Sequence, residues 1–462
     1  MRALYYLFLF VSIIVRVTSV IVKYGDELVP SNQALCHGPV LMVALADAPS
    51  GTQEATFSFA LQFDPQLAND TVWVDIEVLI SREGSNESTC AQIPSVSAYG
   101  VTTLDRRNVM DPDWSSKTFT VTQTGFHFLS ISNHSPKRSI SFTGESVWKN
   151  PFGQLSGDMY GFLPFYGFLS LLVFGAAIIW TGLNIKYRHD LLQLQHYLSI
   201  MIGICIVEFS AWYLFYDKLN TTGESRKTAL VVVLLLTVLR RAVSRILVVA
   251  VSMGFGVVEP TLPKDQRVKL LVVGGVYFVA GSINEVVTHY GHGHEVDKSS
   301  QFFLIAPSTI LDAIFYWWIF TALADTLSKL KDGNQTSKLV LYNNFSRVLA
   351  CSLAAATIMA LYTIYWMNYW MDYPWMWSQR WFVESGFWQM LYVAILMAVM
   401  VLWRPSSHQR DIAFHQQIPT TDDLDRELKD LDYDDDDDDE VNRDIDSATF
   451  SIEDIEQDLT TE

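Results

Sequence analysis

The sequence lacks the signatures of the common soluble enzymes. It contains no HExxH metal-binding pair, no GxSxG nucleophile turn, no P-loop and no GxGxxG turn before a helix. No basic patch stands outside the apolar segments, so nucleic-acid binding has no support. We therefore expect neither an enzyme nor a nucleic-acid-binding protein, and the sequence predicts no metal site.

Cysteine is scarce, with four residues in 462. Cys205 and Cys351 lie inside apolar runs, where cysteine usually behaves as a small core residue. Cys36 and Cys90 lie in the polar N-terminal region. If that region is luminal, Cys36–Cys90 is the only disulfide that it can form within itself.

Acidic residues outnumber basic ones, and almost all of this excess lies in one segment. Residues 421–462 hold 20 of the 50 acidic residues and three of the 32 basic ones, so the first 420 residues have a net charge of −1. A solvated, disordered cytosolic tail over 404–462 is therefore predicted. The run from Asp434 to Asp439 has a second interpretation, an acidic cluster recognised by cytosolic sorting adaptors.

Long hydrophobic runs are abundant, and half of all residues are hydrophobic. Runs of about 20 apolar residues are typical of membrane-spanning helices. Lysine and arginine are in excess in the loops that would face the cytosol if the N-terminus is luminal, which predicts a luminal N-terminus and a cytosolic C-terminus. Seven spans are predicted within a domain at 151–403, at 160–183, 195–216, 229–253, 268–290, 301–323, 340–368 and 382–403.

The N-terminal region has a different pattern. Residues 1–19 have the charge, apolar run and small end residues of a cleavable signal peptide, with an uncleaved anchor as the alternative. Residues 20–150 alternate apolar and polar side chains in short runs, which predicts an antiparallel β-sandwich. The fold class is therefore an α+β membrane protein, in which a hinge at 150–153 leads into the seven-helix bundle.

Four N-x-S/T sequences are candidate glycosylation sites. Asn69, Asn86 and Asn133 lie between the signal segment and the first span, and Asn220 follows the second span. Glycosylation at these positions would require luminal exposure, which agrees with the predicted orientation.

The third apolar run carries Arg240, Arg241 and Arg245 near its middle. An arginine at the centre of a span is unfavourable by several kcal/mol unless it faces protein, water or an anionic group. We therefore predict an internal cationic cavity, with arginines that reach a headgroup layer as the alternative. Glu208 and Arg240 lie about 12 Å and 16 Å from the luminal end of their spans, so Glu208 is predicted to pair with Arg240 or Arg241, and Asp312 to join them.

Two further acidic residues, Glu285 and Glu384, lie near the predicted luminal surface, where they could line the mouth of this cavity. The cavity could bind a phospholipid, lead a cation across the membrane or receive cargo. An alternative interpretation is a structural ion pair that only holds two helices together.

Seven spans suggest a G-protein-coupled receptor, but span three ends in GFGVVEP and lacks the acidic-Arg-aromatic triplet. The sequences NPFGQLS at 150–156, LRRAVSRILVVAVSMGFGVVEPTL at 239–262, LDAIFYWWIF at 311–320 and LMAVMVLWRPS at 396–406 resemble the transmembrane protein 87 family. That family belongs to the GOLD-domain seven-transmembrane proteins, which also include the yeast Ptm-type proteins.

The resemblance implies a luminal GOLD-type sandwich, a cavity open to the lumen and bilayer, a Golgi location and a role in endosome-to-Golgi transport. The family's acidic residue in span two is matched by Glu208 and its basic pair in span three by Arg240 and Arg241. Phe209 and Leu234 stand where the family has charged residues, which weakens the case for a cation pathway.

Three functions follow from these observations. The first is a Golgi trafficking receptor that cycles through endosomes or the plasma membrane, with a luminal cargo protein, a phospholipid and cytosolic sorting adaptors as partners. The second is a cation channel gated by stretch or pH, in which acidic residues line the pathway. The third is a non-canonical seven-transmembrane receptor for a luminal or extracellular ligand. The three arginines favour the first, because a cation path should be lined by acids.

Overall fold

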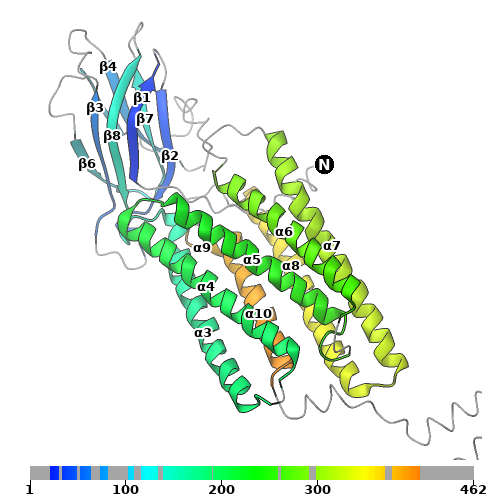
Figure 1. Cartoon of the computed structure of the whole chain (residues 1–462). Helices are drawn as coiled ribbons and strands as arrows, with labels where there is room; N and C mark the ends of the chain where they lie inside the picture. The colour runs from blue at the N-terminus through cyan, green and yellow to red at the C-terminus, as the bar shows by residue number, and fades with distance from the viewer. Residues whose placement is uncertain are drawn as a thin grey trace, which may run out of the picture. The chain divides into compact units, whose positions relative to one another are not determined.

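The structure is a computed structural model, and it describes two regions of regular structure, β-strands followed by helices (Figure 1). The described residues are 21–30, 34–48, 53–63, 73–81, 102–108, 116–133, 139–189, 191–258, 262–290, 298–369 and 377–405. The predicted signal peptide at 1–19 and the acidic tail from 406 onward lie outside these residues.

The N-terminal region contains two four-stranded antiparallel sheets among its described residues. The order in one sheet is β1-β8-β3-β6, and in the other it is β2-β7-β4-β5. The strand bounds are β1 Ile21–Val29, β2 Ala34–Met42, β3 Thr56–Phe63, β4 Trp73–Ser81, β5 Thr102–Asn108, β6 Ser116–Thr120, β7 Gly125–Asn133 and β8 Ile140–Lys149.

The two sheets share one apolar core. Alternate residues of β3 and β8 meet alternate residues of β2 and β7 in this core, because successive side chains of a strand point to opposite faces. Phe57 and Trp148, both fully buried, have ring centroids 4.0 Å apart. The period-two pattern of the sequence thus predicts both the strands and the residues that they bury.

Glycine is required where β8 and β3 approach each other. Gly144 has φ +151°, and a Cβ there would lie 2.1 Å from the carbonyl oxygen of Ala60. No side chain fits in that space, so the bare backbone of Gly144 sets the distance between these strands.

All seven predicted apolar segments are helical. A short helix α2 (Gly157–Tyr160) leads into them, and α9 (Trp377–Trp381) and a π-helical turn (Phe382–Gly386) precede the last. The long helices are α3 Phe162–Lys186, α4 Gln193–Thr222, α5 Lys227–Ser252, α6 Lys264–Tyr290, α7 Lys298–Asp332, α8 Thr336–Tyr369 and α10 Phe387–Leu402.

Five stretches of helix among the described residues are long and apolar enough to cross a membrane, and they lie in α2–α3, α4, α6, α7 and α8. The other two predicted spans differ for separate reasons. Helix α5 carries three arginines in its middle, and α10 has only 16 residues. The sequence pattern is therefore that of a membrane domain with one unusually charged helix.

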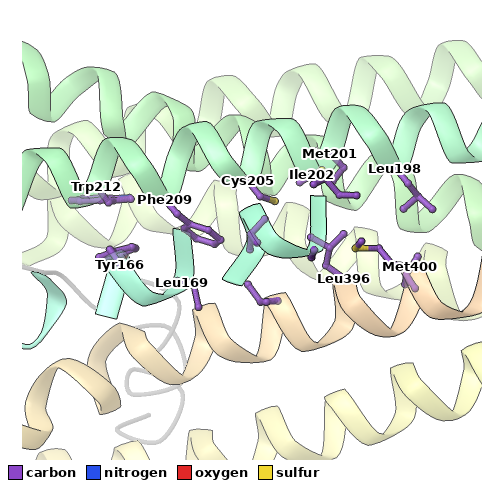
Figure 2. Packing of buried hydrophobic residues seen from close by; sticks show 14 of the residues in the cluster. Tyr166, Leu169, Leu198, Met201, Ile202, Cys205, Phe209, Trp212, Leu396 and Met400 are labelled. Carbon is purple, nitrogen blue, oxygen red and sulfur yellow. The ribbon is translucent and has the colours of Figure 1, made fainter. Parts of the chain in front are cut away.

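Helix α4 packs its apolar face against α3 and α10 (Figure 2). Leu198, Cys205, Phe209 and Trp212 recur at helical spacing along this face and are all buried. The ring of Trp212 stacks on Tyr166 of α3 with centroids 5.6 Å apart. This packing holds the middle of α4, where Glu208 lies, at a fixed position beside α5.

The predicted hinge at 150–153 is a hydrogen-bonded turn. The Asn150 side chain accepts from the backbone N–H of Val43 (2.8 Å) and donates to the carbonyl of Leu155 (2.7 Å). The Asn220 side chain, at the end of α4, donates to the Phe152 carbonyl (3.1 Å) and accepts from the Leu155 N–H (3.2 Å). The two asparagines thus fix the connection between the β-strands and the helices.

Candidate functional site

The candidate site is built on α5, whose three central arginines each meet a carboxylate from a different helix. Arg240 pairs with Glu208 of α4. Arg241 Nη1 lies 2.5 Å from Glu285 Oε1 of α6, and Arg245 Nη2 lies 2.7 Å from Asp312 Oδ1 of α7. These three arginines are matched by three acids, so the prediction of a cationic interior is wrong for this cluster, which is formally neutral.

The helical geometry of α5 explains why the partners differ. Adjacent residues of a helix point about 100° apart, so Arg240 and Arg241 face different neighbouring helices. Arg245 lies one turn beyond Arg241 on nearly the same face and reaches α7. The predicted pairing of Glu208 with an arginine is confirmed for Arg240, whereas Arg241 has Glu285 as its partner.

The Arg240–Glu208 pair is the most deeply buried. The side chains are 3% and 0% exposed, respectively. Arg240 Nη2 donates to Gln389 Oε1 of α10 at 2.8 Å, and its guanidinium carbon lies 4.2 Å from the ring centroid of Tyr392. Arg240 therefore links its own helix α5 to α4 and α10. Removal of the Glu208 carboxylate would leave the buried charge of Arg240 without compensation.

Sequence reasoning missed Gln389 and Tyr392. A signal for Gln389 was present, because it is a polar residue within an otherwise apolar run of 16 residues. No comparable signal marks Tyr392, because tyrosine is common in membrane helices. Its contact with Arg240 depends on the packing of α10 against the bundle.

The other two pairs lie between α5, α6 and α7 and are more open. Arg245 lies between the rings of Tyr277 and Tyr316, with its guanidinium carbon 5.6 Å and 4.8 Å from their centroids. Arg241 keeps 39% of its side chain exposed although it stands in the middle of α5. Arg241 is therefore the most accessible of the three central arginines of α5, since Arg240 and Arg245 keep 3% and 20% of their side chains exposed.

The residues predicted to line a cavity mouth have different positions. Glu285 is an ion-pair partner of Arg241, with 14% of its side chain exposed, so it is part of the charge cluster. The neighbouring Asn284 is buried, and its Oδ1 atom has no hydrogen-bond partner among the described residues. The backbone of Glu384 lies in the π-helical turn, and its side chain falls outside the described residues.

Two of the four predicted glycosylation sites have buried or engaged amides. Asn133 is 2% exposed, and its Nδ2 atom donates to the carbonyls of Val29 (3.1 Å) and Pro30 (3.2 Å). Asn220 is held in the turn between strands and helices described above. Because a glycan is attached through this nitrogen, the structure disfavours the prediction at both positions.

The remaining predicted modifications fall outside the described residues. Asn69, Asn86 and Cys90 have no described position. Cys36 has a described backbone in β2, where it pairs with Ser130, but its side chain is not described. Glycosylation of the two asparagines and the Cys36–Cys90 disulfide therefore stay predictions.

Comparison with known proteins places this helix cluster within a known domain. Residues 161–410 match the family model described as GOST, seven transmembrane domain. The chain is similar to transmembrane protein 87B of Mus musculus, with 25% identity over 404 residues that cover 83% of this chain and 68% of the relative. It is also similar to transmembrane protein 87A of Homo sapiens, with 29% identity over 289 residues (62% and 51%).

A fungal relative is similar over much of the same region. Membrane protein PTM1 of Saccharomyces cerevisiae is 27% identical over 320 residues, which cover 68% of this chain and 61% of the relative. The chain thus spans about half to two thirds of the length of these curated relatives.

Proposed function

The chain belongs to the GOST seven-transmembrane family, and from this premise we propose that it is a Golgi membrane protein that acts in endosome-to-Golgi transport. In this proposal the β-strand region is a GOLD-type sandwich in the lumen, and the helix domain binds a phospholipid. The predicted resemblance to the transmembrane protein 87 family and the Ptm-type proteins is confirmed by the family match and the relatives. The resemblance alone does not say how the protein acts, and our proposal is that it acts as a carrier or receptor.

The observation that carries the proposal is that the three central arginines of α5 are balanced by three acids of neighbouring helices. A pathway for cations needs acidic or carbonyl groups that are available to the passing ion. Of the acids that a cation pathway would use, Glu208 and Asp312 are each paired with an arginine, as is Glu285, and the side chain of Glu384 falls outside the described residues. This arrangement weighs against the channel alternative and favours a site that recognises a ligand with charges of both signs.

A zwitterionic phospholipid has the charges that suit this site. Arg241 uses one nitrogen, Nη1, for Glu285, and 39% of its side chain is exposed. A guanidinium has five N–H donors in a planar fork, and two of them can bind a phosphate together. In this proposal Arg241 binds the phosphate of the headgroup, and the carboxylate of Glu285 attracts its ammonium group.

In the transport role, the N-terminal β-strand region and the C-terminal acidic segment would each bind a partner. The β-strand region has its own buried core and would recognise a luminal cargo protein. The acidic segment at 421–462 would bind cytosolic sorting adaptors. We expect that deletion of 421–462 moves the protein away from the Golgi in fluorescence images, and an unchanged distribution would leave the segment without a sorting role.

The transport proposal is tested in cells that lack the protein and are supplied with variants. The readout is the rate at which an endocytosed reporter with a sulfation site becomes sulfated in the Golgi. Arg241→Ala is expected to reduce this rate several-fold and to lose a co-purified phospholipid in native mass spectrometry. Arg347→Ala is the matched control, because Arg347 is an exposed arginine of α8 whose described side-chain contact is Asn344.

A second measurement separates transport from conduction. Purified protein is reconstituted in liposomes, and currents are recorded under stretch and at several pH values. Silent liposomes together with slow sulfation in the Arg241→Ala cells support the carrier. Currents that Glu208→Gln and Arg241→Ala alter would overturn it in favour of a channel, and normal sulfation with Arg241→Ala would overturn the role of the lipid site.

A further inference from the structure

A second possible binding site is an apolar groove of about 460 Å³, far in sequence from the ion pairs of α5–α7. Its walls come from α2, α3, α9 and α10, and they include Pro164, Phe165, Phe168, Trp381 and Met390. Among the described residues, the lining contains no charged side chain. Its polar groups are the hydroxyls of Tyr160 and Ser378 and the indole N–H of Trp381.

The floor of the groove is held in place by close packing. A Cβ at Gly161 would lie 2.1 Å from the Trp381 ring, and a Cβ at Gly386 would lie 2.8 Å from it. The indole is therefore fixed between two stretches of bare backbone, and Phe165 packs beside it with ring centroids 5.0 Å apart. A flat aromatic surface fixed in this way is preformed for a ligand, so little ordering entropy would be lost on binding.

The groove opens toward the outside of the helix bundle. Phe168 is 63% exposed and Met390 is 47% exposed, although both lie on apolar helices. Helix α3 is long and apolar enough to cross a membrane, so its exposed apolar side chains face lipid. Tyr160 and Trp381 stand where these helices begin, and tyrosine and tryptophan are enriched at the boundary between membrane and water.

The chemistry of the lining selects among lipids. A phospholipid would bring a phosphate, and the part of the lining that the structure describes has no cation to match it. The neighbouring Arg380 does not line the groove and lies over the Phe126 ring of β7, 6.0 Å from its centroid. The volume lies within the range of pockets that take one small ligand, about 300–1,000 Å³. A rigid, uncharged lipid with a single hydroxyl fits these conditions.

We propose that this groove binds a sterol. The sterol hydroxyl lies at the Tyr160 and Ser378 end, at the membrane boundary, and the fused rings lie along Trp381, Phe165 and Phe168. The site is separate from the phospholipid site proposed on α5, because none of its lining residues belongs to α5, α6 or α7. Occupancy of the groove would then depend on the sterol content of the bilayer.

The test uses full-length protein in phosphatidylcholine nanodiscs that contain a photoreactive cholesterol analogue. We expect labelling of peptides from α3, α9 and α10 that saturates and is competed by unlabelled cholesterol. Met390→Trp should fill the mouth of the groove, and Phe168→Ala should remove one of its walls. Each should weaken binding about tenfold, which corresponds to ~1.4 kcal/mol. Both positions are exposed, so these variants should fold normally.

Two controls make the result decisive. Phe174→Ala changes an exposed phenylalanine of α3 that does not line the groove, and it should leave labelling unchanged. Arg241→Ala should also leave sterol labelling unchanged, so failure of the phospholipid proposal can be told apart from failure of this one. Labelling that does not saturate, that survives Met390→Trp, or that a photoreactive phospholipid competes away would overturn the sterol site.

Discussion

His127 offers a quantitative test of the β-strand region, because the structure buries it as a neutral imidazole. It lies on β7 with 2% of its surface exposed, and its Nδ1 atom lies 2.9 Å from the carbonyl oxygen of Gly125. Since a carbonyl only accepts hydrogen bonds, Nδ1 carries the proton and donates it. Burial lowers the pKa of His127 from 6.5 to about 4, because the charged form loses its water.

The direction of the pH effect follows from this lowered pKa. Between about pH 6.5 and pH 4 the unfolded chain binds a proton at His127 and the folded chain does not, so the free energy of unfolding falls as the pH falls. Each pH unit within this window removes ~1.4 kcal/mol. The loss is therefore negligible at pH 7, about 2 kcal/mol at pH 5 and about 3 kcal/mol at pH 4. Burial also lowers the pKa of His37, which adds to the effect in the same direction.

Native-state hydrogen exchange of the full-length protein measures this loss locally. Peptides from β7 are followed by mass spectrometry at pH 7 and pH 5, and the rates are corrected for the intrinsic pH dependence of exchange. His127→Asn is the matched variant, because its amide keeps a donor near the position of Nδ1 and does not titrate. We expect protection of the wild-type protein to fall about 30-fold between the two pH values, and much less in the variant. An equal fall in both proteins would refute the assignment to His127.

Three further predictions concern single positions. Glu208→Gln should destabilise the helix domain by about 3–5 kcal/mol, because it leaves the Arg240 charge buried without a carboxylate; an unchanged melting temperature in detergent would contradict this reasoning. Asn133→Gln should not change the mass removed by a glycosidase, since the native amide is buried and already donates to two carbonyls; a loss of one glycan would show that the site is modified. Gly144→Ala should destabilise the β-strand region by about 1–3 kcal/mol through overpacking. Gly25→Ala is the control, because a Cβ at Gly25 would lie in open space. Equal thermal stability of the two variants would contradict the close approach of the strands.

Much of the fold could be predicted from the sequence, because it depends on local periodicity. Alternation over 20–150 predicts strands, and the described part of this region holds eight of them in two sheets with a common core. Apolar length predicts seven helices, all of which are present. The predicted hinge at 150–153 is different: its position is correct, but its rigidity comes from Asn220, which is about 70 residues away in the sequence. Local patterns do not report such a contact.

The candidate site was predictable only in part. Three arginines in one apolar run predict that the helix domain has a polar interior, since bare arginines are too unfavourable in a membrane. Depth along the helices also predicts the pairing of Glu208 with an arginine, because two groups at similar depth on neighbouring helices can meet. The prediction that Asp312 joins this polar core is confirmed by its pair with Arg245, but the sequence does not show that Glu285 pairs with Arg241 and completes the charge balance.

The sequence by itself determined which segments are strands, which are helices, and that one helix carries charges that need partners. These properties depend on the chemistry and spacing of residues along the chain. Only the tertiary structure decided which partner each charge receives and which asparagine amides are engaged. The packing of α5 against α4, α6 and α7 sets the first, and the contacts of Asn133 and Asn220 set the second. Both depend on distances between segments far apart in the sequence, and side-chain chemistry alone does not fix those distances.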